Sequence, residues 1–345
     1  MRFQTGTSPH IAPRNTVARV MRRVLCATLP GVAVMIGFFG WGVLITIAIA
    51  SIVAVAAEAA LLTVRDKPLK LYLGDFSALV TGWLLGIALP PLSPWWLTAL
   101  AAGFAIVVAK HLYGGLGQNL FNPAMVGYVV VLIAFPLEMS SWAPADGLFA
   151  GAMGFSDALR VILIGQLPSG VAADAISGAT PLDYLRTQLE LGRDMAEIGT
   201  GTALLGNVAG KGWEWVSAAF MAGGLWLVAV RTAAWQIPAA MLATLTLSAS
   251  LFYAIDPATY TSPWFHLFSG AAIFGAFFIA TDPVTASTTP RGRLIYGAGI
   301  GVLTYIIRTF GGYPEGVAFA VLLMNIAAPT IDYYTRPRVF GARQG

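Results

Sequence analysis

Cysteine, histidine and charge are all scarce in this chain of 345 residues. The single cysteine, Cys26, excludes an intrachain disulfide, a CxxC redox pair and a cysteine-ligated cluster. The three histidines lie far apart in the sequence and show no metal-ligand spacing, so no metal site is predicted. If the chain takes part in redox chemistry, an organic cofactor must therefore carry the electrons.

Charged residues make up only 10% of the chain, whereas a soluble domain carries about 25%. Apolar residues make up 57%, which is enough for about ten spans of roughly 20 residues each. This composition excludes a soluble enzyme with one membrane anchor. It also argues against nucleic-acid binding, although the net charge is +4. We predict an all-α polytopic membrane protein.

Ten apolar segments predict membrane-spanning helices, at about 24–39, 43–64, 76–90, 95–112, 121–141, 215–230, 237–254, 264–280, 294–310 and 315–333. The first apolar run is about twice the length of one span, and Gly40-Trp41-Gly42 divides it. The pattern gives a cytoplasmic N-terminal segment 1–23, five spans over 24–141, a polar segment 142–214, five spans over 215–333 and a cytoplasmic tail 334–345.

The basic residues predict the orientation of these spans. With the N-terminus inside, 15 of the 20 basic residues fall in cytoplasmic segments, and four more lie in the long segment 142–214. Arg308 is the exception among the short outer segments. Both termini are therefore predicted in the cytoplasm. The segment 142–214 is predicted outside, as a small subdomain with a net charge of −4 from eight acidic and four basic residues.

Two stretches of the chain are similar to each other. They are Ser93-Pro94 followed by Lys110-His111-Leu112-Tyr113-Gly114-Gly115, and Thr289-Pro290 followed by Arg308-Thr309-Phe310-Gly311-Gly312. Proline and first glycine are separated by 20 residues in one copy and 21 in the other. The predicted topology puts the two double glycines on opposite sides of the membrane, which indicates an inverted repeat of five spans plus five. Ordinary loop glycines are the alternative.

The outer segment contains Asp174-Ala175-Ile176-Ser177-Gly178-Ala179-Thr180-Pro181-Leu182-Asp183. Thr180, Pro181 and Asp183 are typical of the N-cap, first and third positions of a helix, and Gly192 would end that helix. A purely structural role is therefore one interpretation. The other is that a phosphate attached to the Thr180 hydroxyl would meet the free N–H groups and the positive end of the helix dipole.

The sequence D-x-x-S-G-A-T resembles the flavinylation sequence of a family of membrane subunits. The family comprises the D subunit of the Rnf ion-translocating electron-transport complex and the B subunit of the sodium-translocating NADH:quinone reductase, and the former fits better because the N-terminal region is short. Similar patterns extend over most of the chain: Ser8-Pro9-His10 with Met21, Asp75 with Thr81-Gly82 and Leu89-Pro90-Pro91, Gly114 to Ala124, Thr281-Asp282-Pro283-Val284-Thr285, and Gly311 to Gly316.

The resemblance implies FMN joined through its phosphate to Thr180 by a flavin transferase outside the cytoplasm, with Asp174, Ser177, Gly178 and Ala179 completing the recognition sequence. It implies a subunit of a redox-driven ion translocase in the bacterial inner membrane that couples electron transfer between NADH and ferredoxin to Na⁺ or H⁺ movement. The implied partners are other membrane subunits, a periplasmic flavin subunit and cytoplasmic iron–sulfur subunits. A second, noncovalent riboflavin is implied without residues to assign to it.

Several carboxylates are candidates for a cation path, because carboxylates within membrane spans are functional candidates by default. Glu58 lies inside the second span, and Asp75, Asp282 and Asp332 lie near span ends. Glu58 is the best placed of them, and the alternative is that it pairs with a snorkelling Arg65, about two helical turns away. No catalytic residue is predicted. The alternative function is a solute transporter or channel with an inverted-repeat fold similar to that of urea channels.

Overall fold

The computed structural model describes residues 16–145, 153–168, 170, 176–199, 204–206, 208–313 and 315–337. Within these ranges the chain is built from helices, with no β-strand and only two isolated β-bridges. The prediction of an all-α protein is confirmed.

The helices form two halves, one on each side of the polar segment 142–214. The first half contains α1 (Val17–Phe39), α2 (Gly42–Val64), α3 (Leu69–Leu73), α4 (Ser77–Ala88), α5 (Trp95–Gly103) with the π-helix η1 (Phe104–His111), α6 (Pro123–Ala134) and α7 (Pro136–Ser140). The second half contains α12 (Trp213–Ala229), α13 (Gln236–Ile255), α14 (Pro263–Phe268), α15 (Ala272–Phe274) with the π-helix η3 (Gly275–Ile279), α16 (Pro290–Phe310) and α17 (Val317–Thr335). Every predicted span overlaps helical residues, and the division at Gly40-Trp41-Gly42 is confirmed.

Among the described residues, four helices are long and apolar enough to cross a membrane by themselves: α1, α2, α13 and α17. Several other predicted spans are shorter or interrupted, while α16, with 21 residues, is long but is not among these four. The eighth, at 264–280, is interrupted between α14 and α15, where Gly270 adopts a left-handed φ of 64°. A broken span leaves backbone groups without helical partners, and such groups are tolerated at membrane depth only where they are buried in protein or line a cavity.

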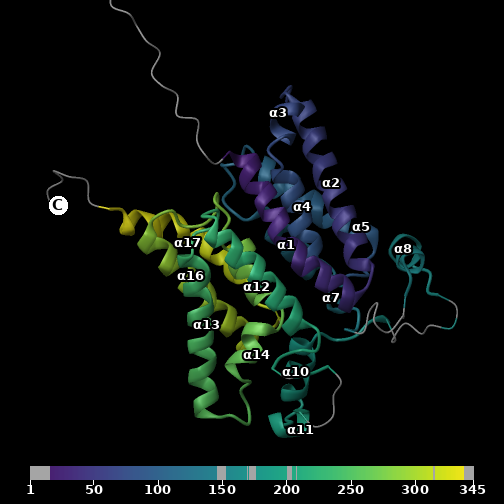
Figure 1. Cartoon of the computed structure of the whole chain (residues 1–345), viewed down its shortest axis with the longest axis vertical. Helices are drawn as coiled ribbons and strands as arrows, with labels where there is room; N and C mark the ends of the chain where they lie inside the picture. Colours follow the sequence, from purple (N-terminus) through teal and green to yellow (C-terminus); the bar gives the residue numbers. More distant parts are fainter. Residues whose placement is uncertain are drawn as a thin grey trace, which may run out of the picture.

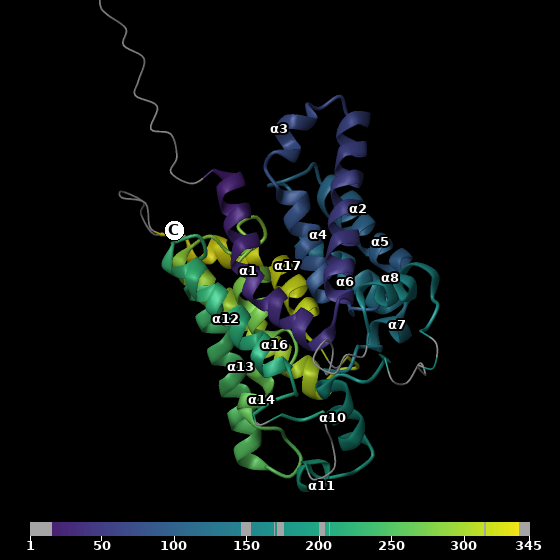
Figure 2. The same cartoon turned by 45° about the vertical axis from the view of Figure 1, so that its right-hand side comes forward.

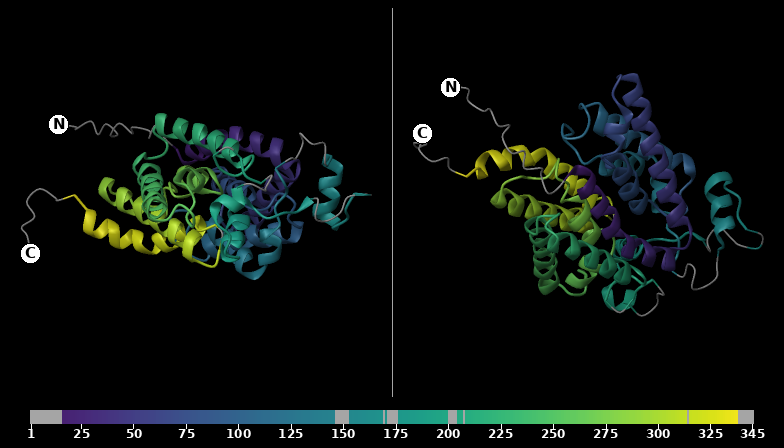
Figure 3. Two further views of the ribbon diagram at one scale, coloured as in Figure 1. Left: turned by 90° about the horizontal axis from the view of Figure 1, so that it is seen from below. Right: turned by 45° about the horizontal axis from the view of Figure 1, so that its top comes forward.

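The two halves lie side by side, the first in purple and blue and the second in green and yellow (Figures 1 and 3). Helix α1 packs against α12, and α6 packs against α17. Small residues permit the first contact: a Cβ atom on Gly31 would collide with the ring of Phe220, and one on Gly223 would collide with the carbonyl of Ala27. The inverted repeat stays a prediction, which is supported by this pairing of the first span with the sixth and of the fifth with the tenth.

The helices of the outer segment pack in two places (Figures 1 and 2). Ala158 and Ile162 of α8 (Phe155–Ile164) pack against Ile45 in the first half. Helix α10 (Pro181–Glu190) and the short α11 (Met195–Gly199) lie beside α14 of the second half, where Leu182 and Phe265 share a hydrophobic cluster. The described helices of the predicted outer subdomain therefore pack against the membrane helices of both halves.

Candidate functional site

Thr180 stands at the N-terminus of α10, as the sequence predicts. It has an extended conformation, its Oγ1 accepts a hydrogen bond from the backbone N–H of Asp183 at 3.2 Å, and Pro181 follows as the first helical residue. Gly192, with a φ of 78°, follows the end of the helix. The predicted helix start and stop are confirmed, and the Thr180 side chain is held by its own helix.

The residues around Thr180 are anchored on both sides. Before it, Gly178 and Trp142 exchange two backbone hydrogen bonds of 3.1 and 2.7 Å. After it, the side chain of Pro181 fits so closely against Gly210 that a Cβ atom there would collide with it. Ser177 and Ala179 belong to the same anchored stretch, whereas Asp174 lies outside the described residues.

A cavity of about 380 Å³ opens beside Thr180, between the outer segment and both halves. Its walls are mainly apolar and carry several aromatic side chains: Tyr128, Trp142, Trp213, Phe220 and Phe274. A few polar residues also line it: Thr180, Asp183, Ser217 and Glu315. A largely apolar cavity with few polar groups is typical of sites for organic ligands and cofactors.

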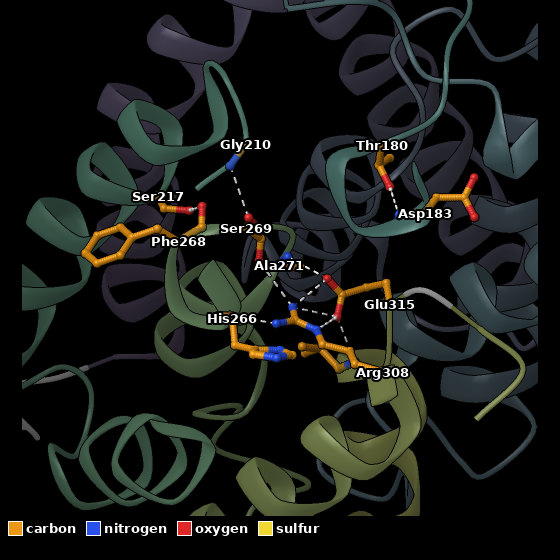
Figure 4. A network of polar contacts seen from close by, with 11 residues as sticks. Thr180, Asp183, Gly210, Ser217, His266, Phe268, Ser269, Ala271, Arg308 and Glu315 are labelled. Atoms are coloured by element: carbon orange, nitrogen blue, oxygen red, sulfur yellow. Dashed lines mark hydrogen bonds and ion pairs between the residues drawn. The ribbon is translucent and has the colours of Figure 1, made fainter. Parts of the chain in front are cut away.

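Asp183 lies near Thr180 (Figure 4), and both residues line the cavity. Partial burial raises the pKa of its carboxyl group above the usual value, Arg186 lowers this pKa, and Glu190 raises it further. The raised pKa means that the folded chain disfavours the ionised form of this carboxyl group.

An ion pair between Arg308 and Glu315 borders the cavity where the eighth span is broken (Figure 4). The Arg308 Nη2 to Glu315 Oε2 distance is 2.9 Å. The guanidinium also donates to the carbonyl oxygens of His266 at 2.6 Å and Ser269 at 3.3 Å. Arg308 was the exception to the positive-inside count. Its charge lies inside the protein, so the side chain does not belong to an exposed outer loop.

A second ion pair lies in the first half. Lys110 Nζ lies 2.5 Å from Glu58 Oε2 and donates to Ser77 Oγ at 2.7 Å. Ser77 in turn donates from its hydroxyl and its backbone N–H to Asp75 Oδ1, both at 2.6 Å. Two cation-path candidates, Glu58 and Asp75, are therefore joined by one chain of hydrogen bonds.

The alternative interpretation, in which Arg65 pairs with Glu58, is wrong. The Arg65 guanidinium donates to the carbonyl oxygen of His111 at 2.8 Å, while Lys110 occupies the position beside Glu58. The reason is geometric: η1 brings Lys110 to Glu58 from a different helix, and sequence distance along α2 does not show this contact.

Asp282 lies near the same network. It accepts a hydrogen bond from Thr285 Oγ1 at 2.8 Å and lines a smaller cavity of about 90 Å³, together with Lys110 and Ser77. Asp332 lies elsewhere and accepts bonds from the backbone N–H groups of Thr288 and Thr289. Asp282 thus shares a cavity with Lys110 and Ser77, the residues that bond to Glu58 and Asp75. Asp332 lies apart from this network.

Three residues of these ion pairs were not among the predicted site residues: Lys110, Arg308 and Glu315. One signal was available, because each copy of the repeat has a basic residue a few positions before its double glycine, Lys110 in the first and Arg308 in the second. Both side chains are buried, with side-chain exposures of 2% and 1%. A basic residue near the end of each of two similar apolar segments indicates a buried partner for each copy.

Known proteins resemble the chain over its whole length. The model of the NQR2, RnfD, RnfE family matches residues 4–341. Proteins named as the D subunit of the ion-translocating oxidoreductase complex, from Escherichia fergusonii and Salmonella heidelberg, are each 51% identical to it, with 100% of both chains covered. A protein of the same name from Cronobacter sakazakii is also 51% identical, over 99% of this chain and 100% of its own. The chain belongs to the NQR2, RnfD, RnfE family.

Proposed function

We propose that this chain is a membrane subunit of an ion-translocating oxidoreductase complex and carries electrons through FMN joined by a phosphoester to Thr180 Oγ1. One observation carries the cofactor assignment: the hydroxyl that the motif singles out belongs to a residue that lines the 380 Å³ aromatic cavity. Full-length similarity to subunits with the names given above supports the assignment to such a complex.

The residues present fit a flavin. The cavity volume lies within the range of about 300–1,000 Å³ that is usual for organic ligands. Trp142, Trp213 and Phe274 give it aromatic walls, which suit a planar ring system. The N-terminus of α10, ten residues long, presents backbone N–H groups and the positive end of a helix dipole to a phosphate on Thr180.

The chain's own residues have distinct roles in this proposal. Thr180 supplies the attachment oxygen, and the stretch 177–179, with Asp174, is the sequence that a flavin transferase recognises. The pair of hydrogen bonds between Gly178 and Trp142 holds the stretch before Thr180 beside the cavity. The apolar walls exclude water, which strengthens the electrostatic effect of each nearby charge. When bound, FMN supplies one- and two-electron transfer, which no side chain here provides.

Substitution of Thr180 tests the attachment. Thr180→Val removes the hydroxyl group and the helix cap, so flavin fluorescence of the denatured protein in a gel should disappear. Loss of the cap by itself costs about 1 kcal/mol of stability. Thr180→Asn separates the two effects, because asparagine is a good N-cap without a hydroxyl group. We expect a stable chain without covalent flavin.

Thr187→Val is the matched control, because Thr187 lies on the same helix and donates only to the carbonyl of Asp183 in its own helix. Its fluorescence should equal that of the unchanged chain, and the peptide containing Thr180 should keep the added mass of FMN. Fluorescence that persists in Thr180→Asn would overturn the attachment proposal.

The wider proposal concerns the complex. We propose electron transfer between NADH and ferredoxin coupled to Na⁺ or H⁺ movement, with other membrane subunits, a periplasmic flavin subunit and cytoplasmic iron–sulfur subunits as partners. The chain would lie in the bacterial inner membrane with both termini in the cytoplasm. A noncovalent riboflavin and a cation path at Glu58, Asp75 and Asp282 belong to the same proposal. Solute flux through the isolated chain in vesicles without redox substrates would instead favour a transporter.

A further inference from the structure

We infer that Glu315, with Arg308 behind it, is a positioning residue that sets the reduction potential of the cofactor in the Thr180 cavity. This inference rests on the proposed function. It adds a role for an ion pair that neither the motif nor the similarity to relatives assigns.

Five hydrogen bonds fix the Glu315 carboxylate. Its Oε1 accepts from Arg308 Nε at 3.2 Å, from Arg308 Nη2 at 3.0 Å and from the backbone N–H of Val317 at 3.1 Å. Its Oε2 accepts from Arg308 Nη2 at 2.9 Å and from the backbone N–H of Ala271 at 2.7 Å. With donors on both oxygens, the carboxylate has a defined position relative to the cavity.

The two members of the pair differ in what they face. The Glu315 side chain is 18% exposed and lines the cavity, together with Gly270 and Ala271. The Arg308 side chain is 1% exposed and lies behind the carboxylate, against the carbonyl oxygens of His266 and Ser269 (Figure 4). A molecule in the cavity is therefore closer to the negative member of the pair than to the positive one.

This asymmetry has a direct electrostatic consequence. The interaction between charges weakens with distance, and it is strong where water is excluded. Reduction adds negative charge to a bound cofactor, so a nearby carboxylate disfavours the reduced form and lowers the reduction potential. Arg308 opposes this effect from a greater distance. The ion pair as a whole is neutral, yet the electrostatic potential that it produces in the cavity is negative, because the carboxylate is nearer.

Gly270 helps to place the Glu315 carboxylate at the cavity. Its left-handed φ of 64° breaks the eighth span, and a Cβ atom at this position would collide with Glu315 Oε2 and lie 2.6 Å from Leu182 Cδ1. The break brings the carboxylate close to α10, whose first residue follows Thr180. The backbone geometry thus holds the charge and the attachment site at one cavity.

The test is a redox titration of the Thr180-dependent flavin signal in the intact complex, with the Thr180→Asn complex as the background. Glu315→Gln removes the negative charge and leaves that of Arg308, so the midpoint potential should rise. Arg308→Gln leaves the carboxylate uncompensated, so the potential should fall. A purely structural role would lower stability in both variants without opposite shifts of the potential.

Glu190→Gln is the matched control, because it removes one negative charge from α10 itself at a side chain that is 63% exposed. Its midpoint potential should equal that of the unchanged complex. Because the two main variants have opposite expected signs, either one tests the inference if the other does not assemble. Covalent flavin with an unchanged potential in the variant that assembles would overturn the inference and leave the proposed function intact. A wild-type chain without covalent flavin would overturn both.

Discussion

In each half of the molecule a lysine or arginine side chain is buried near the end of the fourth predicted span, Lys110 in the first half and Arg308 in the second. Each contacts a serine in the third predicted span of its own half. Ser77 is the first residue of α4, and Ser269 lies shortly before α15. Lys110 donates to Ser77 Oγ at 2.7 Å, and Arg308 donates to the carbonyl oxygen of Ser269 at 3.3 Å. Each also forms an ion pair with a glutamate.

The two ion pairs differ in the origin and exposure of the glutamate. Glu58 lies within α2, and its side chain is 3% exposed. Glu315 lies in the connection between α16 and α17, and its side chain is 18% exposed at the Thr180 cavity. The ion pair of Lys110 is therefore closed, with both side chains buried. The ion pair of Arg308 is open, because its glutamate lines the cavity. Only the open pair can act on a molecule in the cavity beside Thr180.

The largest expected effect comes from removing the two cations. Arg308→Met should destabilise the protein by about 3–5 kcal/mol, because it leaves a carboxylate without its partner. It also leaves the carbonyl oxygens of His266 and Ser269 without this donor. Lys110→Met breaks one ion pair and one hydrogen bond to a serine, so its effect should be large but smaller. Thermal inactivation of the solubilised complex measures both.

The double variant Lys110→Met with Glu58→Met is the control for this comparison. Replacing a closed buried pair by apolar side chains is often neutral, so most of the lost stability should return. A double variant as unstable as Lys110→Met would show that the pair matters through something other than charge balance. Equal stability of Arg308→Met and the unchanged protein would contradict the description of the open pair.

The local features of the site could be predicted from the sequence, since they depend on neighbouring residues. Thr180, Pro181 and Asp183 determine a helix start within four positions, and Gly40-Trp41-Gly42 separates two helices. The family resemblance rested on motifs of this kind. Each is fixed by backbone preferences that adjacent residues decide.

The long-range features could not be predicted. Glu58 and Lys110 are 52 positions apart, whereas Arg65, the alternative partner that is nearer in the sequence, bonds to the carbonyl oxygen of His111. The cavity combines residues such as Met35, Trp142 and Phe274 from three separate parts of the chain. Such contacts depend on how helices pack, and the apolar pattern of the spans is the same whichever neighbours they have.

A smaller effect is expected at two residues with a left-handed backbone conformation. Each lies just before a helix of the third predicted span of its half. Phe76 has a left-handed φ of 63° before α4, and Gly270 has a φ of 64° before α15. The first half therefore tolerates a side chain in this conformation, whereas in the second half a Cβ atom would collide with Glu315. Gly270→Ala should cost about 1–3 kcal/mol from strain and repacking.

Gly178→Ala is the matched control for this substitution, because no atom lies within 4 Å of a Cβ atom built there. The melting temperature of the Gly178→Ala complex should equal that of the unchanged protein. Any loss of covalent flavin in this variant would then report on recognition by the flavin transferase. A Gly270→Ala protein as stable as the control would contradict the close approach of Glu315 at the break.

The smallest effect is expected at Asp183, the second carboxylate that lines the cavity. Glu315 is paired with Arg308, whereas burial is the largest influence on Asp183 and raises its pKa. The folded chain therefore binds this proton more tightly than the unfolded chain, and ionised Asp183 lowers stability at pH values above its folded pKa. That loss disappears as the pH falls below the unfolded pKa. Because the group is half-exposed, the effect amounts to about a few tenths of a kcal/mol.

Asp183→Asn should accordingly be slightly more stable than the unchanged protein at pH 7, with a difference that closes toward pH 4. Thermal unfolding of both proteins across this pH range measures it. The favourable interaction of a carboxylate with the start of α10 acts in the opposite direction. A variant that is less stable at pH 7 would show that the helix dipole outweighs burial. In that case both carboxylates at the cavity would be stabilised in their ionised forms, Glu315 by a cation and Asp183 by a helix.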